Sequence, residues 1–440
     1  IIMWGWNPSE MRDGTNSEYF LTEAGKKGAR VVCNDPRMTL SAVAHADEWF
    51  AIRPGTDVAM MSAMAYVMIT EGLYDRDFVQ RCCSGFDASQ MPAGREDEES
   101  YSDYILGARD GQPKTPEWAE RITAVPRDVI ARIAREYAAA DAAVLYQGYG
   151  MQRRAYGEQV VRAGCVLAAM TGNVGKPGGW ASGIALQAGG GPFWNIFPVL
   201  ENPVKAQIPS FLWTEAVLRG PELTAQQGLV GAERLPHGIK LLWAVASNCI
   251  VNQHANINRT VGIVRDESLL EFFIVQDQFL TPTARFADLV LPACTQFETW
   301  GVEVGWKYGE EVLLEPLILD PPWETKSDYA ICAAVAEKLG IAQEYTEGRD
   351  EREWVDHILT LYRDRFPDVP GIDEFEASNA GVHARRVEEP AIAFADFRRD
   401  PVAHPLDTPS GKVEIFSQAL HALGRPEVIP AVPKYIPEWE

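Results

Sequence analysis

Short apolar runs alternate with longer helix-like segments through the first 180 or so residues, and this alternation constrains the fold more than any other feature. The runs end at turn-forming residues such as Asn7-Pro8, and the helical segments end at glycines such as Gly28 and Gly72. Strands that alternate with helices pair in parallel, with helices on both faces of the sheet. Strands are expected at residues 1–6, 29–33, 49–52 and 143–147, and helices at 19–27, 57–71, 126–140 and 155–170.

The same alternation returns in the second half of the chain, after a glycine-rich stretch at 189–191. Strands are expected at 240–246, 272–275 and 289–291, helices at 329–339 and 351–362, and a turn that leads into a new strand at 408–416. The fold class predicted is α/β, with two doubly wound, mostly parallel, Rossmann-like units and the start of a further domain. The predicted domains are residues 1–180, 181–405 and 406–440. The polar residues 84–116 are expected to form a surface insertion.

Charge and cysteine content exclude several classes of protein. The 40 basic and 62 acidic side chains give a formal charge of −22, which repels nucleic acid. Seven cysteines are present without CxxC spacing, so the pattern does not favour a zinc or iron–sulfur site made from this chain alone. The adjacent pair Cys82-Cys83 is better explained as ordinary thiols than as a redox pair. The methionines of residues 57–71 are expected to pack in the core.

Clusters of glycine, asparagine and aspartate follow the predicted strands, at the sheet edge where ligands of doubly wound folds bind. Loop amides there can hold phosphate, and a carboxylate can accept two hydrogen bonds from a guanine edge or from ribose hydroxyls. Asp35, Asp57 and Asp277 are placed for this role. Structural alternatives remain open for each: Asp57 can favour the start of its helix, and Asp35 and Asp277 can stabilise turns. No GxGxxG or phosphate-binding P-loop occurs, so an NAD site has little support.

Gln152, Arg153 and Arg154 lie just beyond a predicted strand. The planar guanidinium of an arginine at this position can bind an anionic or oxo-bearing ligand through its fork of donors. The alternative is a surface ion pair with Glu158.

Taken in order, these motifs resemble the molybdopterin oxidoreductases of the dimethyl sulfoxide reductase family. The resemblance is greatest to catalytic subunits of membrane-associated, anaerobic S-oxide and N-oxide reductases. It covers almost the whole chain, and its strength lies in the order of individually weak motifs. The matching stretches are Trp-Gly-Trp-Asn-Pro at 4–8, Arg-Pro-Gly-Thr-Asp at 53–57, Ala-Asp-Leu-Val-Leu-Pro-Ala at 287–293, and residues 33–37, 147–154, 170–179, 246–252, 276–285 and 408–417.

The resemblance implies a bis-molybdopterin guanine dinucleotide cofactor carrying molybdenum, with one dinucleotide held by each α/β unit. The residues implied for the first dinucleotide are Gly5, Asn7, Asp35 and Asp57. Those implied for the second are Asn248, Asp277 and Thr283. Asn173 and Gly175 are implied to pack near a pterin, and Gln152 and Arg153 to line the substrate funnel as the catalytic residues.

The family places its protein ligand to molybdenum upstream of the Trp-Gly-x-Asn-Pro strand, where this chain starts. We therefore expect no metal ligand here, a 4Fe-4S cluster only in a missing amino-terminal part, and no activity from this piece alone. The implied reaction is two-electron oxygen-atom transfer from a small S-oxide or N-oxide, such as dimethyl sulfoxide, in anaerobic respiration. Implied partners are a ferredoxin-like iron–sulfur subunit and a membrane anchor subunit, on the periplasmic side of the cytoplasmic membrane.

Three alternatives remain open from the sequence. The same family also acts on nitrate, thiosulfate or polysulfide, selenate and formate. Some relatives keep this fold as non-catalytic structural subunits without molybdenum. An unrelated nucleotide-binding α/β protein would show the same alternation of strands and helices.

Overall fold

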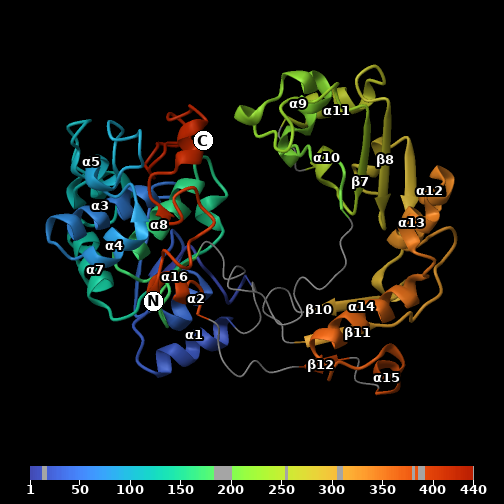
Figure 1. The fold of residues 1–440 in the computed structure, drawn as a ribbon, viewed down its shortest axis with the longest axis horizontal. Coiled ribbons are helices and arrows are strands. Elements are labelled where there is room, and N and C mark those ends of the chain that lie inside the picture. The colour runs from blue at the N-terminus through green and yellow to red at the C-terminus, as the bar shows by residue number, and fades with distance from the viewer. Residues whose placement is uncertain are drawn as a thin grey trace. The chain divides into compact units, whose positions relative to one another are not determined.

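The computed structural model describes residues 1–11, 17–182, 201–252, 256–304, 311–378, 382–384 and 392–439 (Figure 1). The chain divides into two compact units. The first unit is built from residues 1–190 and 387–440, and the second from most of residues 191–386. The glycine-rich stretch at 189–191 lies outside the described residues.

A five-stranded sheet in the order β3-β2-β1-β5-β6 forms the centre of the first unit, and every neighbouring pair is parallel. The α/β class with parallel sheets is thereby confirmed. Strands β2 and β3 lie on one side of β1, and strands β5 and β6 lie on the other side. The strands are β1 (Ile2–Trp4), β2 (Val32–Asn34), β3 (Glu48–Phe50), β5 (Val144–Gln147) and β6 (Trp180–Ser182).

Successive side chains of a strand point to opposite faces of the sheet, so the strands contribute to two cores, one on each face. On β1, Ile2 and Trp4 belong to the larger core, whereas Met3 belongs to the smaller core with Leu21 and Ala42. The helices of the smaller core are α1 (Ser17–Lys26) and α2 (Leu40–His45). Those of the larger core are α3 (Asp57–Thr70), α4 (Arg76–Cys82), α5 (Tyr101–Leu106), α6 (Pro116–Thr123), α7 (Arg127–Ala139) and α8 (Glu158–Met170).

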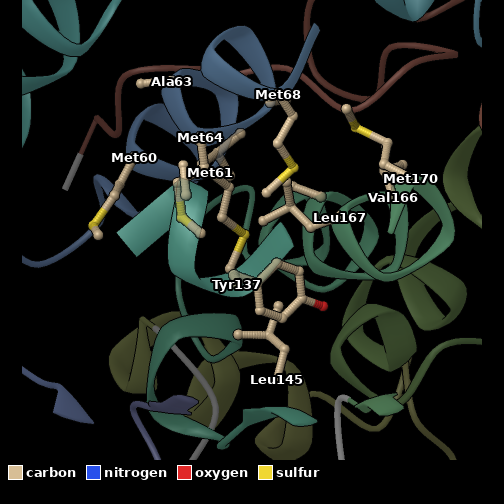
Figure 2. Packing of buried hydrophobic residues seen from close by; sticks show 14 of the residues in the cluster. Met60, Met61, Ala63, Met64, Met68, Tyr137, Leu145, Val166, Leu167 and Met170 are labelled. Carbon is tan, nitrogen blue, oxygen red and sulfur yellow. The ribbon is translucent and has the colours of Figure 1, made fainter. Parts of the chain in front are cut away.

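Methionines dominate the packing of α3 against α7 and α8 (Figure 2). Met60, Met61, Met64 and Met68 are each 0% exposed, and 11 of the 14 residues of α3 are buried. These values confirm that the methionines form core rather than a ligand site. Because α3 is enclosed on nearly every side, its amino-terminal residue Asp57 is held in a fixed place at the sheet edge.

The prediction for residues 84–116 was wrong in part, because this stretch contributes to the core. Tyr101 and Ile105 of α5 are 0% exposed, and Tyr104 is also buried. The helix starts at a capping box formed by Ser100 and Asp103. The neighbouring acidic residues at 96–99 hid this short apolar pattern.

The second unit contains two separate three-stranded sheets. The first, β7-β8-β9, is parallel, with β7 at Leu241–Val245, β8 at Phe272–Asp277 and β9 at Leu289–Pro292. The second, β10-β11-β12, is antiparallel, with β10 at Gly301–Val304, β11 at Glu311–Glu315 and β12 at Val382–Ala384. The sequence analysis did not predict the antiparallel sheet, in which β11 pairs with β12 although α12 to α15 lie between them in the sequence. The helices are α9 (Trp213–Arg219), α10 (Cys249–Asn252), α11 (Ile257–Arg265), α12 (Asp328–Leu339), α13 (Ala342–Thr346), α14 (Glu351–Arg365) and α15 (Ile372–Ala377).

The last described segment returns to the first unit. Strand β13 (Val413–Glu414) pairs in parallel with β4 (Cys83–Ser84), and the Arg398 guanidinium donates to the Gly172 carbonyl at 2.6 Å. The helices of this segment are α16 (Ala395–Arg399) and α17 (Gln418–Ala422). The described residues 406–439 thus pack within the first unit; that residues 406–440 begin a further domain stays a prediction. In the described part of the chain, every helix is too short or too polar to cross a bilayer.

Candidate functional site

A cavity of about 540 Å³ lies where the loops after β1, β2, β3 and β5 meet, in the first unit. This is the point at which the strand order reverses, and doubly wound sheets bind their ligands there. A cavity of this size falls within the range of small-molecule sites. Its lining residues are Gly5, Asn7, Glu10, Met11, Asn34, Asp35, Pro36, Arg37, Thr39, Ile52, Pro54, Gly55, Asp57, Gly150, Met151 and Arg154.

Asp57 is the most perturbed acid of this cavity. Its side chain is 5% exposed, and Oδ1 accepts a 2.8 Å hydrogen bond from the Trp4 indole nitrogen. Burial raises the Asp57 pKa to about 6, against the lowering effect of the Trp4 bond. Asp57 is the first residue of α3, and the preceding Thr56 does not cap the helix, because its hydroxyl donates to the Arg53 carbonyl at 2.6 Å.

Asn7 and Asp35 line the same cavity but also hold its walls together. The Asn7 Oδ1 atom accepts from the Ser41 hydroxyl at 2.7 Å, and Asp35 Oδ1 accepts from the Arg37 backbone N–H at 2.8 Å. Burial raises the Asp35 pKa above its ordinary value. The structure therefore brings Gly5, Asn7, Asp35 and Asp57 together, and it gives Asp35 a share of the structural role that was its alternative.

Asn34 is a cavity residue that the sequence analysis missed. It ends β2, is 0% exposed, and neither its Oδ1 nor its Nδ2 atom has a hydrogen-bond partner among the described residues. A buried amide without partners costs about 1–3 kcal/mol for each unpaired group. The available signal was its position directly before Asp35, since the last residue of a parallel strand lies at the ligand-binding edge.

Of the adjacent arginines after β5, Arg154 lines the cavity, whereas the predicted catalytic pair, Gln152 and Arg153, lies outside it. Arg153 is exposed, and its guanidinium lies 5.1 Å from the centre of the Tyr149 ring. Gln152 is half-buried and is not a lining residue. The Arg154 Nε atom donates to Glu438 Oε1 at 2.7 Å. No sequence feature distinguishes two adjacent arginines, and the pair with Glu438 spans 284 residues.

Asn173 and Gly175 lie at the opposite edge of the sheet. The Asn173 Oδ1 atom accepts from the Ala143 N–H, at the amino end of β5, and its Nδ2 donates to the Thr171 hydroxyl. A Cβ on Gly175 would lie 2.4 Å from the Phe394 carbonyl oxygen. The structure does not bring either residue to the cavity, and their place beside a pterin stays a prediction.

In the second unit, the predicted residues meet at the carboxyl edge of β7 and β8. Asn248 Oδ1 accepts from the Thr283 N–H at 3.1 Å, and the Thr283 hydroxyl accepts from the Val251 N–H at 3.3 Å. Asp277 ends β8, and its Oδ1 accepts from the Phe279 N–H at 3.1 Å. These bonds join the loops that follow β7 and β8 into one local structure.

Possible metal ligands and the adjacent cysteines Cys82 and Cys83 bear on metal-binding and redox chemistry. Within the described ranges, no group of three or more histidines, cysteines, aspartates or glutamates is placed to hold a metal ion. Burial raises the pKa of Cys83 to about 12 and also raises that of Cys82, so both remain thiols at neutral pH. This supports the ordinary role expected for the pair.

Comparison with known proteins agrees with this architecture. The family model described as molybdopterin oxidoreductase matches residues 1–338. The chain is 40% identical to dimethyl sulfoxide reductase DmsA of Escherichia coli (strain K12), over 100% of this chain and 55% of that protein. It is 34% identical to the dimethyl sulfoxide/trimethylamine N-oxide reductase of Rhodobacter capsulatus, over 94% of this chain and 50% of that protein.

A solved structure shares the fold. Acetylene hydratase from Pelobacter acetylenicus matches with a TM-score of 0.62 and 20% identity, over 99% of this chain and 57% of that chain. The chain spans about half the length of the curated relatives it matches. Since the family model covers about three quarters of the 440 residues, the chain belongs to the molybdopterin oxidoreductase family.

Proposed function

We propose that the chain is the central part of a molybdenum enzyme that reduces a small S-oxide or N-oxide by two-electron oxygen-atom transfer. The observation that carries this proposal is the similarity, over the whole chain, to proteins named as dimethyl sulfoxide and trimethylamine N-oxide reductases. The cavity at the switch point of the first sheet adds support, because it has the place and the chemistry of a nucleotide site.

The cavity residues fit one guanine dinucleotide arm of a bis-molybdopterin cofactor. A guanine edge and ribose hydroxyls offer hydrogen-bond donors, and the Asp35 and Asp57 carboxylates accept them. The unpaired Asn34 amide supplies one further donor and one acceptor to a ligand. The loop glycines Gly5 and Gly55 have φ of +57° and +78°, a left-handed conformation that favours glycine. Because glycine has no Cβ, the backbone of these loops can approach a ligand closely.

When bound, the molybdenum–pterin group supplies the electron and oxygen-atom chemistry, and the protein positions it. Under this proposal Asp57 and Asp35 orient the base and ribose, while Asn7 fixes the loop after β1 through its bond to Ser41. The buried helix α3 keeps Asp57 in place during turnover. In the second unit, Asn248, Asp277 and Thr283 would hold the other arm.

Further parts of the proposal concern the complete protein. We assign electron delivery to a 4Fe-4S cluster outside this chain and to a ferredoxin-like subunit, and attachment to a membrane anchor subunit on the periplasmic side. The exposed Arg153 and the half-buried Gln152 remain candidates for contact with substrate.

The test uses the complete gene product purified without oxygen. We expect about one molybdenum and two guanosine monophosphates, released by acid hydrolysis, for each protein. We also expect oxidation of a reduced viologen dye by dimethyl sulfoxide or trimethylamine N-oxide. Activity with nitrate, thiosulfate, selenate or formate instead would overturn the substrate class. Protein without molybdenum from cells that load a known molybdoenzyme would indicate a structural subunit.

A further inference from the structure

The carboxyl-terminal segment reaches back to the rim of the cavity. We call residues 430–438 the strap. The Arg162 guanidinium donates to the Pro430 carbonyl at 2.8 Å, and the Tyr435 N–H donates to the Tyr104 hydroxyl oxygen at 3.0 Å. These bonds tie the strap to α8 and α5, so its last residues are placed by the core of the first unit.

At the end of the strap, Glu438 meets Arg154 in a two-point ion pair. The Arg154 Nε atom donates to Oε1 at 2.7 Å, and Nη2 donates to Oε2. The Glu438 side chain is 11% exposed, and that of Arg154 is 30% exposed. A Cβ on Gly55 would lie 2.5 Å from the Glu438 carboxyl carbon, so the carboxylate rests on the loop that leads into α3.

Arg154 is also the better shielded of the two arginines of the cavity wall. The other, Arg37, has a side chain that is 69% exposed and pairs with Glu10 at 3.3 Å. A phosphoryl group in the cavity of a chain with a charge of −22 needs a local cation, since the overall field repels it. A guanidinium with a fork geometry and reduced hydration is suited to that task.

Two further observations point to a ligand at this place. The 14-residue helix α3 begins at the cavity without a side-chain cap, so the partial positive charge of its first turn faces the ligand site. Independently, the side chain of Asn34 is fully buried in the cavity wall and has no hydrogen-bond partner among the described residues.

We propose that Arg154 binds a phosphoryl group of the nucleotide in this cavity, and that Glu438 is a positioning residue that holds the Arg154 guanidinium at the rim. The proposal rests on the proposed function, because the nucleotide is taken to be the guanine dinucleotide arm. It also assigns the strap a role in ligand binding beyond its packing.

The experiment compares variants of the complete protein by bound guanosine monophosphate, by the temperature at which that nucleotide is released, and by the melting temperature. Arg154→Gln should lower nucleotide content at least about fivefold, the effect of losing a charged hydrogen bond. Arg154→Lys keeps the charge without the fork and should lose less. Glu438→Gln should lower the release temperature while the nucleotide content falls by a smaller factor.

A charge reversal separates ligand binding from a purely structural bridge. The double variant Arg154→Glu with Glu438→Arg restores an ion pair but turns a carboxylate toward the cavity. We expect the melting temperature of the double variant to be higher than that of either charge reversal made alone, Arg154→Glu or Glu438→Arg. Its nucleotide content should stay low. The matched control is Arg425→Gln, which breaks the exposed 2.6 Å pair with Glu427 near the same end of the chain and should change none of the three measurements.

Each outcome decides between the two proposals. Wild-type nucleotide content in Arg154→Gln, or full recovery of nucleotide in the double variant, overturns the role of Arg154 and leaves the proposed function intact. Absence of guanosine monophosphate from the wild-type protein overturns both.

Discussion

The buried carboxylate of Asp57 gives the first unit a pH-dependent stability that can be measured. A pKa raised from 3.8 to about 6 means that the folded protein binds the Asp57 proton more tightly than the unfolded chain does. The stability that this proton contributes is fully present only below the unfolded pKa of 3.8 and is lost as the pH rises through about 6. At 1.36 kcal/mol per pKa unit, the loss is about 3 kcal/mol.

Asp57→Asn isolates this effect, because it removes the charge and keeps an oxygen that can accept from the Trp4 indole at 2.8 Å. We expect the cofactor-free variant to be more stable than wild type by about 3 kcal/mol at pH 7.5, and the difference should shrink toward zero as the pH falls below 3.8. Urea unfolding followed by circular dichroism across this range measures the difference.

The matched control is Asp128→Asn, which changes an exposed aspartate in the first turn of α7. It should change the urea midpoint only slightly and should not reproduce the large gain in stability expected of Asp57→Asn at pH 7.5. Equal pH dependence of stability in wild type and Asp57→Asn would refute the reasoning. It would mean that the folded protein binds the Asp57 proton no more tightly than the unfolded chain does.

Three further variants test other parts of the two units. Gly55→Ala should destabilise the first unit by about 1–3 kcal/mol in thermal melts, because φ is +78° and the new Cβ would lie 2.5 Å from the Glu438 carboxyl group. Asn34→Leu should raise the free energy of unfolding of the cofactor-free protein by about 1–3 kcal/mol in urea titrations, and should lower the nucleotide content of the complete protein as purified; an unchanged content would exclude Asn34 from binding. Asn248→Ala should cost about 1 kcal/mol in the second unit, since the Thr283 N–H loses its acceptor at 3.1 Å; hydrogen exchange at Thr283 measures this directly.

The strands and helices of the first unit were predictable because each is bounded by local signals. The β1 strand ends before Asn7-Pro8, and α3 starts at Asp57 and is followed by Gly72. These signals also located Asp35 and Asp57 at one sheet edge, since the carboxyl ends of parallel strands share an edge. The pattern predicted the class of sheet, doubly wound and parallel, but not the order of its strands.

The remaining features depend on contacts that no local pattern contains. Arg154 could not be preferred over Arg153, because the choice depends on how the loop after β5 turns and on a partner 284 residues away. Asn173 occurs in a glycine-rich stretch that resembles a binding loop, yet its side chain is used to hold the Ala143 N–H. The antiparallel sheet of the second unit needs pairing between β11 and β12, which are far apart in sequence.

The cavity of the first unit concentrates features that make the empty protein less stable. Asp57 carries a buried charge above its pKa, and Asn34 has no hydrogen-bond partner among the described residues. Such features persist where the surrounding structure holds them, and they cluster at functional sites. A ligand that donates to Asp57 and pairs with both the Oδ1 and the Nδ2 atom of Asn34 would recover much of the free energy lost by burying these groups. Binding would then appear as added stability. The melting temperature of the first unit should therefore depend on nucleotide content, and variants that relieve these features should gain stability only when the nucleotide is absent.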